Sequence, residues 1–130
     1  MTPPEPAPEI SDEVVRFIGE FIDSVPQLEA LLLLWDTAPR AWSVDELAGR
    51  IYVSPQATQD IVAMLERRGL IRRDERGAYA FDPEAPSASS IAEVAGTYRR
   101  RLAQVAGLIH SKASQGVLEF ARAFRLKKEP

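Results

Sequence analysis

The side chains best suited to chemistry in this sequence are hydrogen-bonding and charged groups between residues 54 and 76. Gln56 and Gln59 carry amides that can pair with an adenine edge, and Asp60 can accept a hydrogen bond from a cytosine amine. Arginines follow at Arg67, Arg68, Arg72, Arg73 and Arg76. Because arginine neutralises phosphate, and phosphate neutralisation supplies much of the affinity for DNA, this pattern predicts a candidate nucleic-acid surface.

Other kinds of site find little support in the composition. The chain has no cysteine and a single histidine, His110, which excludes disulfides and thiolate metal sites and cannot build a typical zinc site. The acidic pairs Asp12–Glu13 and Asp74–Glu75 are sequence neighbours, and we interpret both as solvated. Without convergent reactive groups, we expect no enzyme, no metal site and no cofactor.

The charge distribution is uneven along the 130 residues. Residues 1–60 carry 11 acidic and three basic side chains, a net charge of −8, whereas residues 61–130 carry eight acidic and 13 basic, a net charge of +5. This asymmetry indicates either a polyanionic partner or attraction between the halves, within one chain or across a dimer. The isoelectric point of about 5.2 lies well below the value above about 9 of an obvious nucleic-acid binder.

The periodicity around the candidate surface predicts a helix over residues 55–68. Ser54 is suited to cap this helix, proline follows at its first position, and Gly69 is suited to end it. The inward face is expected to carry Thr58, Ile61, Val62 and Leu65. The outward face is expected to carry Gln56, Asp60, Ala63 and Arg67, with Gln59 and Met64 at its margins.

Neighbouring segments supply the elements that must position this helix. Apolar spacing and caps predict helices over 11–22, 24–35 and 43–51, with a short extended piece at Trp42. Two short alternating strands, 70–73 and 78–81, flank the turn "DERG". The predicted fold class is mainly α with a small β-hairpin.

The stretch "WSVDELAGRIYVSPQATQDIVAMLERRGLIRRDERGAYAF", residues 42–81, resembles bacterial regulators of the MarR and ArsR classes. The resemblance lies in the "Ser-x-x-Glu-Leu-Ala" opening, a second helix that starts at Ser54, and "Leu-Glu-Arg-Arg-Gly-Leu-Ile" leading into a hairpin. It implies a winged helix-turn-helix with long helical extensions. It further implies that the 55–68 helix enters the DNA major groove while the 70–81 hairpin acts as a wing.

A long helix is predicted from about Ser89 to Ser111. Its apolar residues have nearly heptad spacing and form a seam: Ile91, Val94, Tyr98, Leu102, Val105 and Ile109. The seam can pack on the first helix of the same chain or against a second subunit, and we favour a homodimer. The residues predicted to face DNA belong to the 55–68 helix, its cap and the hairpin. They are Ser54, Gln56, Gln59, Asp60, Ala63, Arg67, Arg68, Arg72, Arg73 and Arg76.

The chain is predicted to divide into three parts. Residues 1–9 form a proline-rich disordered tail, residues 10–86 the winged helix-turn-helix domain, and residues 87–130 a helical extension with an amphipathic last helix at 117–124. The longest apolar run, residues 30–35, is too short to span a bilayer, and no signal peptide is evident. We therefore expect a cytoplasmic protein that does not contact membranes.

Two functions remain open from the sequence. The first is a dimeric transcriptional regulator that binds duplex DNA through the 55–68 helix and the wing. The alternative is a winged-helix interaction module that regulates a transcription or signalling partner without binding DNA. In that case a protein would dock on the 55–68 helix face, whose first two turns lack Lys and Arg, or on the C-terminal helix.

Overall fold

The computed structural model describes residues 10–112. Its elements in chain order are α1 (Asp12–Phe21), α2 (Val25–Asp36), α3 (Val44–Ile51), α4 (Pro55–Arg67), β1 (Ile71–Arg73), β2 (Tyr79–Phe81) and α5 (Ala88–Arg100). A further helical segment spans residues 102–112. The predicted class, mainly α with a small β-hairpin, is confirmed.

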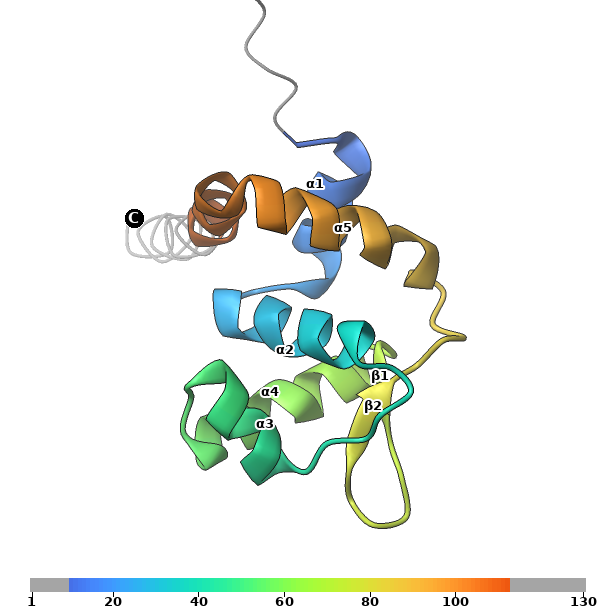
Figure 1. Cartoon of the computed structure of the whole chain (residues 1–130). Helices are drawn as coiled ribbons and strands as arrows, with labels where there is room; N and C mark the ends of the chain where they lie inside the picture. The colour runs from blue at the N-terminus through green and yellow to red at the C-terminus, as the bar shows by residue number, and fades with distance from the viewer. Residues whose placement is uncertain (1–9, 113–130) are drawn as a thin grey trace, which may run out of the picture.

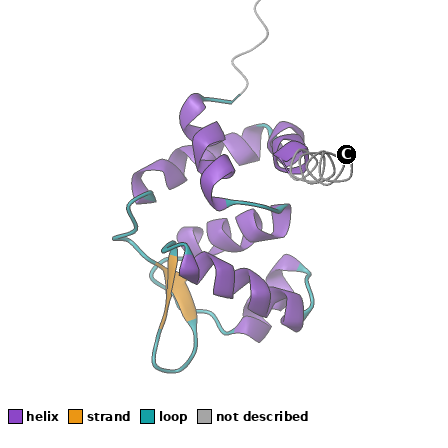
Figure 2. Ribbon diagram, turned by 180° about the vertical axis from the view of Figure 1, so that it is seen from behind, coloured by secondary structure: helices purple, strands orange, loops and turns teal. Residues whose placement is uncertain are grey.

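The helices are arranged in layers, with α2 in the middle (Figure 1). On one side of α2, α1 packs against α5, and α5 also contacts α2. On the other side lie α3, α4 and the hairpin, all of which contact α2. The view from behind shows the same order, with the hairpin extending away from the α1–α5 layer (Figure 2). The α3–α4 unit thus packs against α2.

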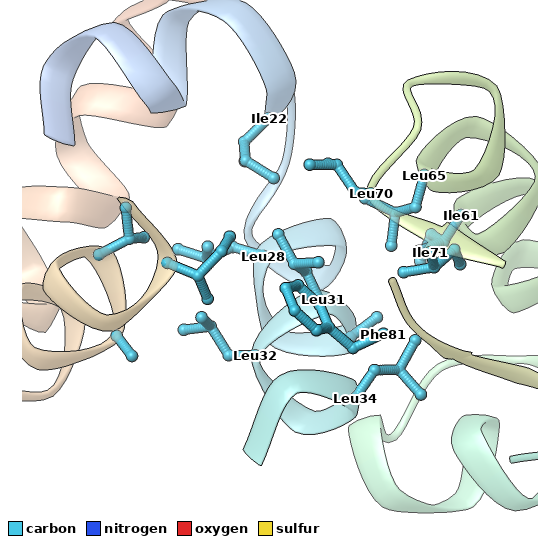
Figure 3. Close-up of a cluster of buried hydrophobic side chains, with 14 of the residues drawn as sticks. Ile22, Leu28, Leu31, Leu32, Leu34, Ile61, Leu65, Leu70, Ile71 and Phe81 are labelled. Carbon is cyan, nitrogen blue, oxygen red and sulfur yellow. The ribbon is translucent and has the colours of Figure 1, made fainter. Parts of the chain in front are cut away.

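Helix α2 is the centre of the hydrophobic core. The Ser24 side chain caps it by accepting a hydrogen bond from the Gln27 backbone N–H, and Pro26 lies in its first turn. Its buried leucines point to both sides: Leu28 and Leu32 toward α5, Leu31 and Leu34 toward the hairpin and α4 (Figure 3). A helix that is apolar on nearly all sides is stable only when it is enclosed, which is the position that α2 occupies.

Local capping explains where α3 and α4 begin. Ser43 and Glu46 form a reciprocal capping box: the Glu46 backbone N–H donates to the Ser43 hydroxyl at 3.1 Å, and the Ser43 backbone N–H donates to the Glu46 carboxylate at 3.0 Å. These hydrogen bonds lower the pKa of Glu46, the backbone N–H of Ser43 being the main cause. Ser54 caps α4 through the Ala57 N–H, and Gly69, at φ +75°, follows its end.

The hairpin is antiparallel, with Ile71 opposite Phe81 and Arg73 opposite Tyr79. Gly77, at φ +83°, permits its turn. Trp42 pairs with Tyr79 through two backbone hydrogen bonds of 2.8 Å, so the segment before α3 is joined to β2. The extended piece predicted at Trp42 is therefore present, and it joins the hairpin to the helix-turn-helix unit.

The prediction of one long helix over 89–111 is wrong, because the chain turns at Arg101, between α5 and residues 102–112. A straight helix of that length would measure about 35 Å, whereas α1, on which α5 packs, measures only about 15 Å. The turn brings Val105 and Ile109 into the core, where they are fully buried. The Lys112 ammonium then donates to the carbonyls of Ile18 and Ile22 at the end of α1.

Some predictions concern residues that lie outside the described part of the chain. These are the disordered tail at 1–9 and the amphipathic helix at 117–124. The predicted division between residues 10–86 and 87–130 falls just before α5 and stays a prediction. Between residues 10 and 112, no helix has both the length and the apolar character that crossing a membrane requires.

Candidate nucleic-acid interface

Helix α4 has the orientation that its periodicity predicts. Thr58, Ile61, Val62 and Leu65 are buried against the core, and the Thr58 hydroxyl donates to the Ser54 carbonyl at 2.8 Å. The opposite face is open: Ser54, Gln56, Gln59, Asp60 and Arg67 are exposed, and Ala63 and Met64 are half-buried. The amide-bearing end of α4 is therefore presented to solvent, as a helix that reads base edges must be.

The hairpin arginines form a second open group. Arg72 and Arg73 on β1 and Arg76 in the turn are all exposed. None of the ion pairs found among residues 10–112 involves these three side chains or Arg67. Their guanidinium groups are thus not engaged in an ion pair within that part of the chain, which suits them to phosphate. The Asp74 carboxylate instead accepts hydrogen bonds from the backbone N–H groups of Arg76 and Ala78, at 2.9 Å each.

Arg68 differs from the rest of the predicted DNA-facing set, because its side chain is engaged within the fold. Its guanidinium donates to the backbone carbonyl of Phe21 and to the Asp23 carboxylate, the latter at 2.7 Å. The direction of the side chain follows from helix geometry, because position 68 lies on the side of α4 that turns toward the α1–α2 junction. Arg68 therefore fastens α4 to the rest of the chain, whereas its neighbour Arg67 faces solvent.

Sequence reasoning missed two arginines that stack on Trp42. The Arg40 guanidinium carbon lies 3.7 Å from the centroid of the Trp42 ring, and that of Arg50 lies 5.4 Å from it. Both distances are within the range of a cation–π interaction. Arg40 also pairs with Glu46 at 3.3 Å. These contacts bring two cations to the junction of α3 and the hairpin, and no motif in the sequence signalled them.

The predicted dimer seam is divided by the turn at Arg101. Ile91, Val94, Val105 and Ile109 are buried within the single chain, Tyr98 is half-buried, and Leu102 is 57% exposed. Burial, followed by the nearby Glu29 carboxylate, raises the pKa of Tyr98. Most of the seam is thus covered by the chain's own helices, the alternative that the sequence left open. Leu102 and Val15, 41% exposed on α1, remain as open apolar side chains.

No group of three or more metal-ligating side chains gathers anywhere in the described span from residue 10 to residue 112. His110 is exposed on the last helical segment. The acidic residues of the predicted solvated pairs, Asp12, Glu13, Asp74 and Glu75, are also exposed. The polar side chains that the fold leaves open to solvent include the amides of α4 and the arginines of the hairpin.

The chain is a winged helix-turn-helix protein: α3 and α4 form the helix-turn-helix, and the β1–β2 hairpin is the wing. The model of the MarR family matches residues 24–76, from the cap of α2 into the turn of the hairpin. Over this segment, which is less than half of the chain, the sequence is similar to the MarR family, in agreement with the resemblance described above.

Two solved structures are similar to the chain. A MarR family protein from Bacillus stearothermophilus is 22% identical, with 86% of this chain and 77% of that chain covered and a TM-score of 0.48. ZitR of Lactococcus lactis is 17% identical, with 80% of this chain and 73% of that chain covered and a TM-score of 0.48. No curated protein matches this chain.

Proposed function

We propose that this protein is a dimeric transcriptional regulator that binds duplex DNA. The observation that carries the proposal is the joint exposure of one face of α4 and of the three wing arginines, next to a buried opposite face of α4. The MarR family match over residues 24–76 supports a regulator rather than an enzyme. Such a role would place the protein in the cytoplasm.

In the proposed complex, α4 lies in the major groove. Gln56 and Gln59 are suited to pair with adenine and Asp60 to accept from cytosine, while Ala63 is small enough to let the helix approach a thymine methyl group. Arg67 at the end of α4 would contact phosphate. Arg72, Arg73 and Arg76 would contact the phosphate backbone next to the groove and supply most of the salt-dependent affinity.

The homodimer is part of the same proposal. Regulators of this class bind DNA as dimers, and two copies would place two α4 helices on successive half-sites. Leu102 and Val15 are the exposed apolar side chains of the α1–α5 layer, so we place the contact between subunits there. That layer lies on the opposite side of α2 from α4 and the hairpin, which leaves the DNA-facing side free (Figure 1).

A salt titration tests DNA binding. The affinity of the purified full-length protein for a fluorescent pool of mixed-sequence duplexes is measured by anisotropy between about 50 and 200 mM salt, where phosphate contacts weaken steeply. We expect the Arg72→Ala, Arg73→Ala double variant to lower the slope of log affinity against log salt by about 0.9 for each lost contact. The matched control, Arg16→Ala with Arg100→Ala, removes the same charge from exposed positions on α1 and α5.

The interaction module is the second candidate, and α4 itself favours it. Its first two turns carry Asp60 and no cation, and Ala63 and Met64 form a small apolar surface between its polar ends. If wild-type protein binds no duplex at the lowest salt, the regulator proposal fails and this candidate replaces it. The module predicts that Met64→Glu releases a co-purifying protein partner, while Glu66→Gln, on the neighbouring exposed surface, does not.

A further inference from the structure

Tyr52 is the most exposed large apolar residue in the described part of the chain, at 94%. It lies in the turn between α3 and α4, two residues before the Ser54 cap. A folded protein gains stability by covering aromatic rings, so a ring left open to this extent contributes little to the fold.

The backbone of Tyr52 makes the exposure more notable. It has φ +57° and ψ +44°, the left-handed conformation, and is the only residue other than glycine with a positive φ among residues 10–112. The N–H groups of Tyr52 and Val53 both donate to the Ala48 carbonyl, as at a helix end where glycine is the usual residue. A tyrosine here carries a steric cost that glycine would not, and the ring gains no burial in exchange.

The position of the turn between α3 and α4 indicates which part of a DNA duplex the Tyr52 ring would contact. In a helix-turn-helix, the first helix crosses the phosphate backbone and the second enters the groove by its N-terminal end. The turn joins these two parts. In the layer formed by α3, α4 and the hairpin, this turn lies at one end and the hairpin at the other (Figures 1 and 2). A phosphate contact at Tyr52 would therefore oppose those of the wing across the groove.

We propose that Tyr52 is a DNA-contacting residue whose phenolic hydroxyl donates a hydrogen bond to a backbone phosphate, on the side of α4 away from the wing. Tyrosine hydroxyls are among the ordinary donors to DNA phosphates, and such contacts fix register without reading sequence. The inference rests on the proposed DNA-binding function and adds to it an uncharged contact at the entry of α4. The steric cost at residue 52 is then retained for binding rather than for folding.

Two variants test the proposal in the full-length protein. Tyr52→Gly removes the ring and relieves the backbone, so we expect a thermal midpoint equal to or above that of wild type. Tyr52→Phe keeps the ring and removes only the donor. Both are expected to bind the mixed-sequence duplex pool about fivefold more weakly, the effect of one lost hydrogen bond of ordinary strength. The salt slope should stay that of wild type, because no charge is lost.

The outcomes are separable. Wild-type protein that binds no duplex at low salt overturns the proposed function, and the Tyr52 contact with it. Wild-type binding together with unchanged affinity of both variants overturns the Tyr52 contact alone. Weaker binding of Tyr52→Gly with full binding of Tyr52→Phe overturns the hydrogen bond, since the ring face would then make the contact. A lowered thermal midpoint in Tyr52→Gly would show a structural role and also overturns the proposal.

Discussion

The Arg68 guanidinium donates to the Asp23 carboxylate at 2.7 Å and so joins the C-terminal end of α4 to the junction of α1 and α2. The same carboxylate accepts from the Lys112 ammonium at 2.9 Å, on its other oxygen. Asp23 thus connects three segments that are far apart in the sequence. Because α4 carries the proposed DNA-facing side chains, this contact bears on how firmly that surface is held.

We predict that Arg68→Ala lowers the free energy of unfolding by about 1–2 kcal/mol, since charge-assisted hydrogen bonds to Phe21 and Asp23 are lost from a partly buried position. Arg67→Ala, the exposed neighbour, should change stability by less than about 0.5 kcal/mol. Urea denaturation measures the free energy of unfolding of both variants.

The two variants should behave in the opposite way in DNA binding. Arg67→Ala should lower the slope of log affinity against log salt, and Arg68→Ala should leave that slope unchanged. Equal slopes for the two would contradict the assignment of Arg68 to the fold.

A pH dependence of stability follows from Asp23. Its hydrogen bonds with Lys112, then with Arg68, lower its pKa below the ordinary value of 3.8. A carboxyl whose folded pKa is depressed contributes stability that is present above its unfolded pKa and lost as the pH falls through the folded pKa. We therefore expect stability to decline below about pH 4.

The matched variant is Asp23→Asn, which keeps the shape of the side chain and removes its charge. Its free energy of unfolding should be lower than that of wild type at neutral pH. The two curves should converge as the solution is acidified below the ordinary aspartate pKa. A constant difference between them from pH 7 to about pH 2 would show that Asp23 acts without its charge. Glu13 and Glu46 have lowered pKa values as well, so the variant should retain some acid sensitivity.

The layer formed by α3, α4 and the hairpin could be predicted from the sequence because the signals for its helix ends are local. Ser43 with Glu46, Ser54 with Pro55, and Gly69 mark helix ends through contacts within a few residues. The inward face of α4 also followed from periodicity alone, because an amphipathic helix has only one apolar side to bury.

What could not be predicted depends on contacts between distant segments. Helical periodicity already puts Arg68 on the Ile61 side of the predicted helix, but its contact with Asp23, 45 positions earlier, depends on the approach of the α1–α2 junction. The turn at Arg101 also depends on a contact between distant segments, because α5 packs on α1 and α1 is too short to cover a longer helix. The helices predicted over 43–51 and 55–68 leave Tyr52 between them, but its positive φ depends on how α3 ends and α4 begins.

The wing turn offers a prediction on backbone conformation. Gly77→Ala should lower the free energy of unfolding by about 1 kcal/mol, because φ +83° is unfavourable for any residue with a Cβ. No atom outside its immediate surroundings lies within 4 Å of the added Cβ, so the effect comes from the backbone and not from a clash.

Gly49→Ala is the matched control for that change. It also adds a methyl group to open space, but inside helix α3, where alanine is favoured over glycine by about 1 kcal/mol. The same substitution is therefore expected to have opposite signs at the two positions, as measured by thermal and urea denaturation. Stabilisation by Gly77→Ala would mean that the wing turn adopts another conformation in solution.

The last prediction separates folding from assembly in the α1–α5 layer. Ile109 is fully buried in the chain's own core, so Ile109→Ala should destabilise the protein by about 2–4 kcal/mol. Leu102 is 57% exposed, so Leu102→Glu should leave the unfolding of a single chain nearly unchanged. If two copies meet through this layer, as proposed, the added charge would be buried without a partner in the dimer. Sedimentation velocity should then show a dimer for wild type and a monomer for Leu102→Glu. A Leu102→Glu protein that remains dimeric would place the subunit contact elsewhere, because a buried, unpaired glutamate at the interface could not be tolerated without a large loss of affinity.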